Sequence, residues 1–447
     1  MRRARLATRK KRAFSALLVA VFAAGCGGVG PSVADRPNTL VTMGFGLPDE
    51  HATARVAVFK SHRPEVDLRI NEGVFDEQQF LSSVAAGDPP DLVYADRRKL
   101  GGYAARGAVQ DLGPCLAQRH VDLADYRQAA VRQVTYEGTV YGVPDFFTVR
   151  VLILNNPVLR ANGVDPARVS TTDWNALAEV AAKLSRVENG RVGRIGFDPR
   201  VPEFVAMWAK ANAVDLVGDE PHLDDPRVVE AVRYTTDLVR EQGGWAAFKA
   251  FRDTFDSFGA NNELVTGQVA AMAMDSWYVN TLAANSPAVD VTIAPLTDRR
   301  GDPLTEAGGQ AWAIPKGSRH PELACEFIAT MTAADTWVTA AKARRDALAK
   351  KGKPYSGTFT ANRAADERIF AEAYDPRGIR VLEQGVQVLR SLQDKAFALP
   401  PSPAASDLVR SWEAAVTRVL LGQQQPEESM AQAQREAGRA LTRVGGR

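Results

Sequence analysis

Strand-like runs alternate with amphipathic helical segments from residue 39 onward. Short apolar blocks and period-two alternation predict strands at 39–43, 66–70 and 91–95. Apolar residues spaced three and four apart predict helices at 51–63, 76–86 and 97–106. Strands that alternate with helices in this order predict a mostly parallel sheet covered by helices.

A second set of alternating elements follows residue 148 and predicts a second α/β lobe. Strands are expected at 149–155, 269–274, 289–294 and 311–314, and helices at 173–184, 226–240, 406–421 and 426–443. Ligands of open α/β sheets bind at the carboxyl ends of the strands. The positions that follow strand-like runs, and are therefore candidate site positions, are Phe45, Asp96, Phe146, Asp275 and Gln310.

The amino terminus has the pattern of an export signal. Residues 2–12 are basic, residues 13–24 are apolar, and small residues then lead to Cys26. The segment 23–26 (AAGC) resembles a bacterial lipobox, although Ala23 stands where Leu is commonest. In that signal the Cys is diacylated and becomes the new amino terminus, and two acyl chains hold a protein stably at a membrane. Ordinary cleavage near Ala24 is the alternative. We expect a signal peptide at 1–25 and a flexible tether at 26–37.

Removing this leader changes the charge of the protein. The whole chain has 55 Lys and Arg against 53 Asp and Glu, a net charge of +2. Residues 1–25 contain seven of the basic residues and no acidic one, so the remainder carries 48 − 53 = −5. A nucleic-acid-binding protein would show a basic body or stripe, and we therefore expect no nucleic-acid partner. Beyond the leader, no apolar run is long enough to span a membrane.

No catalytic, metal-binding or cofactor-binding motif is present in the sequence. The patterns G-x-S-x-G, H-E-x-x-H and G-x-G-x-x-G and the P-loop are absent. The five His are far apart, lack ligand spacing and are expected on the surface. We therefore expect neither an enzyme nor a metal or cofactor site. Cys115 and Cys325 either form a disulfide in an oxidising compartment or are two separate buried thiols.

Nine short segments together resemble the extracellular solute-binding proteins of ABC importers, in the group that includes maltose- and oligosaccharide-binding lipoproteins. They are residues 64–66 (PEV), 85–93 (AAGDPPDLV), 100–104 (LGGYA), 138–144 (GTVYGVP), 154–156 (LNN), 173–177 (DWNAL), 267–272 (GQVAAM), 308–315 (GGQAWAIP) and 322–328 (ELACEFI). Each segment alone is weak, but their order and spacing are specific, and they cover most of the mature chain.

The resemblance implies a two-lobed, type II periplasmic-binding-protein-like fold. Lobe one would comprise residues 38–147 plus 305–356, and lobe two residues 148–304 plus 357–447. A carbohydrate would bind in the cleft between them, and hinge closure would present the closed form to ABC permease subunits. We expect a monomer, anchored through Cys26 on the extracytoplasmic side of the cell membrane.

Sugars offer apolar C–H faces and many hydroxyls, so aromatic and polar side chains both contribute to a sugar site. Trp277 follows a buried strand and stands where, by the resemblance, related proteins place a stacking Trp. Tyr278 is its neighbour, and packing inside the lobe is the alternative role of both. Asp275 either bonds a sugar hydroxyl or caps the next helix.

Further candidates each have a packing role as the alternative. Gln310 and Trp312 follow two glycines, which let a ligand approach the backbone. Phe146 and Phe147 lie at the first crossover between the lobes, where apolar side chains would face the cleft.

Two aromatic residues complete the candidate set. Phe45 ends the first strand. Trp208 lies in a helical stretch, where the helix core is the favoured alternative.

One departure from the family pattern affects the ligand. Relatives that bind maltose-type sugars have an aromatic residue and an acidic–basic pair before Gly-Gly-Tyr, but this chain has Ala95-Asp96-Arg97-Arg98-Lys99. Asp96 is the candidate to replace the acidic residue. Arg97 or Arg98 could instead meet an anionic solute, such as a sugar acid or a glycerol-phosphate-like molecule. A solvated helix start is the alternative for this run, and a secreted carbohydrate-active enzyme is a third possible function.

Overall fold

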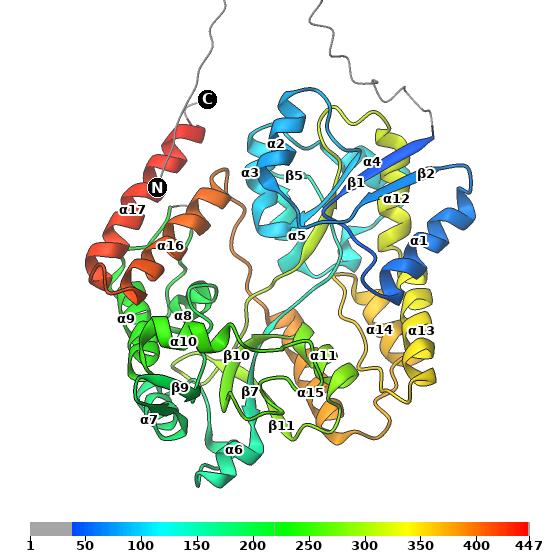
Figure 1. The fold of residues 1–447 in the computed structure, drawn as a ribbon. Coiled ribbons are helices and arrows are strands. Elements are labelled where there is room, and N and C mark those ends of the chain that lie inside the picture. Colours follow the sequence, from blue (N-terminus) through cyan, green and yellow to red (C-terminus); the bar gives the residue numbers. More distant parts are fainter. Residues whose placement is uncertain (1–37, 219, 446–447) are drawn as a thin grey trace, which may run out of the picture. The chain divides into compact units, whose positions relative to one another are not determined.

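The computed structural model describes residues 38–218 and 220–445, in which two larger β-sheets each have helices packed around them (Figure 1). Two small two-stranded sheets pair β4 (Thr135–Tyr136) with β5 (Thr139–Val140) and β8 (Arg186–Glu188) with β9 (Arg191–Arg194). This arrangement confirms the predicted α/β class with two lobes. The predicted signal peptide, the tether and Cys26 lie outside the described residues. The residue ranges predicted for the two lobes stay a prediction.

Most predicted elements form within one or two residues of their expected ends. The helices are α1 (Glu50–His62), α2 (Glu77–Ala85), α3 (Leu100–Ala105), α4 (Gly113–Gln118), α5 (Gln128–Val134), α6 (Asn156–Ala161), α7 (Trp174–Leu184), α8 (Val205–Ala211), α9 (Pro226–Glu241), α10 (Gly244–Arg252), α11 (Trp277–Asn285), α12 (Pro321–Thr332), α13 (Ala334–Lys350), α14 (Arg363–Glu372), α15 (Arg380–Leu392), α16 (Ala405–Leu420) and α17 (Pro426–Gly445). Asp225 caps α9, because its side chain accepts a hydrogen bond from the Arg227 backbone N–H.

The first sheet has the strand order β2–β1–β3–β13–β6. Its strands are β1 (Thr39–Met43), β2 (Asp67–Asn71), β3 (Leu92–Asp96), β6 (Val143–Pro144) and β13 (Gln310–Ala313). β1 pairs in parallel with β2 and β3, whereas β13 is antiparallel to β3 and β6. Leu92 packs in the same core as Phe59 of α1, and the next residue, Val93, packs in the same core as Phe80 of α2. Helices therefore cover both faces of this sheet.

The second sheet differs from the expected parallel arrangement. Its order is β10 (Ala271–Asp275), β7 (Arg150–Asn155), β11 (Val291–Thr297), β12 (Pro303–Leu304), and every pair in it is antiparallel. Helix α11 connects β10 to β11, which run parallel to each other on either side of β7. All six residues of β7 are buried. Alternating elements therefore correctly predict an α/β lobe, but the strand inserted between β10 and β11 runs in the opposite direction.

Four stretches of chain lie side by side between the two sheets, and two of them, from β6 to β7 and from β12 to β13, lead from one sheet to the other. The first crossing leads from β6 to β7, and Thr148 exchanges two backbone hydrogen bonds with Gly308 of the second crossing, at 3.0 and 2.9 Å. The Phe147 N–H donates to the Phe359 carbonyl at 3.2 Å, which adds the third stretch. The Phe397 N–H donates to the Thr305 carbonyl at 3.0 Å, which adds the fourth. A hinge is therefore built from segments far apart in the sequence.

Cys115 and Cys325 form a disulfide, which decides between the two states left open by the sequence. Their Cα atoms are 5.7 Å apart, and 210 positions separate them in the chain. The bond ties α4 to α12.

Within the described ranges, no helix combines the length and the hydrophobicity needed to cross a membrane.

Candidate functional site

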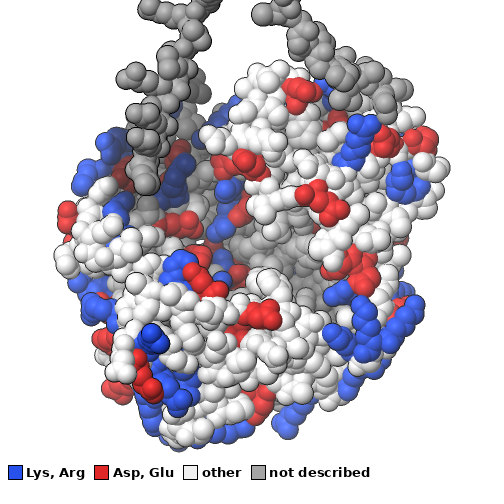
Figure 2. Space-filling view, in the orientation of Figure 1, with Lys and Arg blue, Asp and Glu red and all other residues white. Residues whose placement is uncertain are grey.

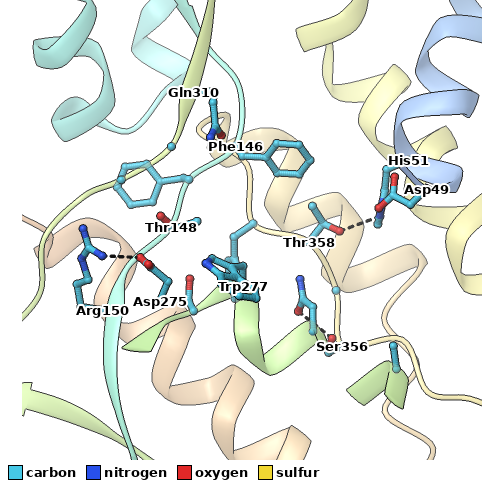
Figure 3. A pocket seen from close by; sticks show the side chains of 18 of the residues that line it. Asp49, His51, Phe146, Thr148, Arg150, Asp275, Trp277, Gln310, Ser356 and Thr358 are labelled. Atoms are coloured by element: carbon cyan, nitrogen blue, oxygen red, sulfur yellow. Dashed lines mark hydrogen bonds and ion pairs between the residues drawn. The ribbon is translucent and has the colours of Figure 1, made fainter. Parts of the chain in front are cut away.

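A cavity of about 600 Å³ lies where the crossings meet the ends of β3 and β10 (Figure 3). This volume is in the range of small-molecule sites. The space-filling view shows the molecule hollowed on this side (Figure 2). The structure brings six of the ten predicted site residues to the cavity wall: Asp96, Phe146, Phe147, Asp275, Trp277 and Gln310.

Trp277 is the central aromatic residue of the cavity. It is the first residue of α11, directly after β10 and Ser276, and its indole is half-buried (Figure 3). One face of the indole stacks on Phe258, with ring centroids 5.4 Å apart and an interplanar angle of 13°. Tyr278 packs edge-to-face with the same indole, with centroids 5.7 Å apart at 85°. Because Trp277 also lines the cavity, the part of the indole that these rings leave uncovered can contact an apolar ligand surface.

Phe146 and Phe147 lie on the first crossing, as expected. Phe146 is half-buried and packs edge-on against Trp337, with centroids 5.0 Å apart at 75°. Phe147 is only 1% exposed, so it lies beneath the wall of the cavity. Phe146 therefore presents the larger apolar surface to a ligand.

Two ion pairs contribute polar groups to the cavity. Arg150 donates to Asp275 at 2.9 Å, and Arg98 donates to Asp96 at 2.7 Å. Burial alone would raise the pKa of Asp96, but the charge and hydrogen bonds of Arg98 hold it below its ordinary value. Asp96 also accepts a hydrogen bond from the Arg98 backbone N–H and so caps the turn that follows β3. Both carboxylates retain lone pairs that a ligand hydroxyl can use.

Arg97 does not face the cavity. Its side chain is fully buried, and its guanidinium donates to the backbone carbonyls of Phe146, Gly308 and Gln310. Burial lowers its pKa to about 10, so it remains charged at neutral pH. Arg97 therefore joins the first two crossings, and the expectation that it meets an anionic solute is wrong.

Trp312 and Phe45 are core residues, so their predicted position in the cavity is wrong. They are 0% and 4% exposed and pack against each other, with ring centroids 4.8 Å apart. Tyr94 and Phe327 complete this aromatic cluster against the Trp312 ring, at 4.7 and 5.2 Å. Side chains from β3, β13, α12 and the loop after β1 thus fill the space that a ligand would need.

Trp208 and Tyr278 are also corrected, because each is buried and held by a hydrogen bond away from the cavity. Trp208 is 1% exposed, and its indole N–H donates to the Pro199 carbonyl at 2.9 Å. Tyr278 is 0% exposed, and its hydroxyl donates to Glu263 at 2.8 Å. Helix-core packing, the favoured alternative for Trp208, is what the structure shows.

A buried histidine network on the cavity wall escaped the sequence analysis. His51 is 7% exposed, so its predicted surface position is wrong. Its Nε2 lies 2.9 Å from the Tyr355 hydroxyl and 2.8 Å from the Thr358 hydroxyl, and its Nδ1 lies 3.3 Å from Asp49 (Figure 3). Burial lowers the pKa of His51 although Asp49 opposes the shift, so the ring is neutral at pH 7. The polar, glycine-containing segment 354–359 between two helices was the available signal.

The charges of the cavity are largely balanced internally. Arg98 pairs with Asp96, Arg150 with Asp275, and Arg344 with Glu50. Burial raises the pKa of Glu413, which also lines the cavity, despite the nearby charge of Arg98. Across the described ranges, no group of three or more His, Cys, Asp or Glu is arranged to hold a metal ion.

Known proteins that are similar to this chain in sequence or in fold indicate its family. A family model described as bacterial extracellular solute-binding protein matches residues 60–362. The arabinooligosaccharide-binding protein of Bacillus subtilis (strain 168) is 22% identical over 327 residues, which are 70% of this chain and 73% of that protein. An uncharacterized lipoprotein in the oleD 5' region of Streptomyces antibioticus is 30% identical over 184 residues, 40% of each chain.

A solved structure matches most of the chain. CpMnBP1 with mannotriose bound has 25% sequence identity and a TM-score of 0.71, covering 89% of this chain and 99% of its own. The family model spans more than half of the present chain, and the fold matches over most of it. The chain belongs to the bacterial extracellular solute-binding protein family of ABC importers.

Proposed function

We propose that the protein is a lipid-anchored receptor that binds a neutral carbohydrate, a small oligosaccharide, in the cavity and delivers it to an ABC permease. The observation that carries the proposal is the half-buried indole of Trp277, which has one face on Phe258 and lines a cavity rich in hydrogen-bonding groups. A flat aromatic face beside Asp275, Gln310 and Asp96 suits a sugar ring with an apolar face and hydroxyls at its edge.

The balance of charge supports a neutral ligand over an anionic one. The basic run that suggested an anion is already engaged: Arg97 binds backbone carbonyls, Arg98 binds Asp96, and Lys99 donates to Glu77 at 2.9 Å. An anion beside this run would have to displace these carboxylates or remain unpaired, which costs free energy in a partly desolvated site. Hydroxyl groups can bond to the same ion pairs without breaking them.

The relatives give independent support for this ligand class. One similar protein is named for binding arabino-oligosaccharides, and the similar structure was solved with mannotriose bound. A further relative is named a lipoprotein, which agrees with acylation at Cys26 on the extracytoplasmic side of the cell membrane. We propose a monomer whose lobes close about the four adjacent stretches of chain between the two sheets, which include both connections from one sheet to the other.

A thermal-unfolding screen tests the ligand class. The protein is heated alone and with maltotriose, mannotriose, arabinotriose or glycerol 3-phosphate. A ligand at about 100 times its dissociation constant adds about 2.7 kcal/mol to the free energy of unfolding. We expect stabilisation by at least one trisaccharide and none by glycerol 3-phosphate. The reverse pattern would favour the anionic solute, and turnover of a bound oligosaccharide would instead indicate a carbohydrate-active enzyme.

A further inference from the structure

Phe258 is a large apolar side chain that lies mostly in solvent. It belongs to the loop between α10 and β10 and is 69% exposed. It does not line the cavity, but its ring stacks nearly parallel on Trp277 at 5.4 Å and 13°. The stack accounts for the part of the ring that is shielded from water.

The stack restricts what the Trp277 side chain can do. An indole at the first position of a helix, half-exposed beside a cavity, would otherwise lose rotamer freedom when a ligand binds. With Phe258 stacked on one face, the indole beside the cavity has fewer orientations open to it before the ligand arrives. Preorganisation of this kind raises affinity because the cost of ordering is met during folding.

The loop that carries Phe258 is fixed to the helix that carries Trp277. The Asn285 side chain, at the end of α11, donates to the Phe258 carbonyl at 2.8 Å. Asn262 donates to the Ser286 hydroxyl at 2.8 Å, just beyond the same helix end. At the start of α11 the Tyr278 hydroxyl donates to Glu263 at 2.8 Å, and both side chains are buried. The loop is therefore tied to both ends of α11, which holds the two rings in register.

We propose that Phe258 is a positioning residue that fixes the Trp277 indole for sugar stacking, held in place by the Glu263–Tyr278 and Asn285 contacts. This assignment rests on the proposed carbohydrate function. In this assignment the buried Tyr278 and the exposed Phe258 both help to hold the Trp277 indole, although neither lines the cavity.

A double-mutant cycle tests the assignment. Dissociation constants for maltotriose, mannotriose and arabinotriose are measured by calorimetry for the wild type, Phe258→Ala, Trp277→Ala and the double variant. Loss of the stacking interaction between the two rings should weaken sugar binding by about 2- to 10-fold in Phe258→Ala. In the Trp277→Ala background the same change should have no further effect. Phe258→Tyr keeps the stacking ring and should restore wild-type affinity.

Val265→Ala is the matched control, because Val265 lies in the same loop and is 45% exposed but does not stack on Trp277. It should leave affinity unchanged. Equal losses from Phe258→Ala with and without Trp277 would show an independent contact and overturn the proposal, as would unchanged affinity in Phe258→Ala.

A ligand-free measurement separates this inference from the proposed function. The fluorescence of Trp277 is obtained by subtracting the signal of the matching variant that also carries Trp277→Ala. Acrylamide quenching of this fluorescence should increase in Phe258→Ala and not in Val265→Ala. If no trisaccharide binds the wild type, the carbohydrate proposal fails while the quenching result still decides whether Phe258 fixes the indole. Unchanged quenching would contradict the positioning role.

Discussion

Arg150 donates a hydrogen bond to Asp275 at 2.9 Å, and the two residues are direct partners in the pairing of β7 with β10. Only 8% of the Arg150 side chain is exposed, so the pair is largely withdrawn from water. Asp275→Asn should lower the free energy of unfolding by about 1–3 kcal/mol, because the buried guanidinium loses the nearer of its two charged partners and keeps only Glu306, at 3.6 Å. Urea unfolding monitored by circular dichroism measures this loss.

The exposed pair of Lys249 with Asp253 provides the control for that experiment. Its side chains are 48% and 56% exposed, and Asp253→Asn should change stability by less than about 0.5 kcal/mol. Equal effects of the two substitutions would show that the Arg150–Asp275 pair behaves as a surface contact.

Gly309 is required at the second crossing. Its φ is +132°, and a Cβ there would overlap the Phe146 carbonyl oxygen and the Arg97 guanidinium. Gly309→Ala should therefore destabilise the protein by more than about 1 kcal/mol. Gly438 lies in α17 with no neighbour near its missing Cβ, and Gly438→Ala should stabilise by about 0.5–1 kcal/mol. Thermal unfolding of both variants measures the difference, and equal shifts would contradict it.

The disulfide should contribute strongly to stability, because Cys115 and Cys325 close a loop of 210 residues. Replacing both with Ala should lower the free energy of unfolding by about 2–5 kcal/mol. The measurement is denaturant unfolding with and without a reductant. A reductant that destabilises the double variant as much as the wild type would show that the bond does not act in this way.

Asp366 should make stability depend on pH. Burial raises its pKa to about 6 from 3.8, even though Arg127 lies 2.7 Å away. A raised folded-state pKa gives stability that is present below pH 3.8 and is lost as the pH rises through about 6. The loss amounts to about 3 kcal/mol, which Asp366→Asn removes from the pH profile. Parallel profiles of the wild type and Asp366→Asn between pH 4 and 7 would contradict this reasoning.

Local patterns predicted the secondary structure well. The alternation in β2 and the apolar spacing in α9 are properties of neighbouring residues, so the sequence displays them directly. The position of Trp277 at the end of a buried strand is of the same kind, and the structure places it in the cavity.

The errors concern contacts between segments far apart in the chain. Trp312 also ends a strand run, but Phe45 and Phe327 cover it, and nothing near residue 312 reveals them. His51 is buried because Tyr355 and Thr358, more than 300 residues later, return to its ring. The spacing of residues in one sequence does not reveal such long-range contacts, because they depend on how the segments between the lobes assemble.

Calorimetric titration of the wild type and Trp277→Ala with maltotriose, mannotriose and arabinotriose tests the central claim most directly. The account predicts that at least one neutral trisaccharide binds the wild type and that Trp277→Ala weakens that binding by about 10-fold or more while the protein remains folded. Absence of binding by all three sugars, or equal affinity in Trp277→Ala, would contradict it.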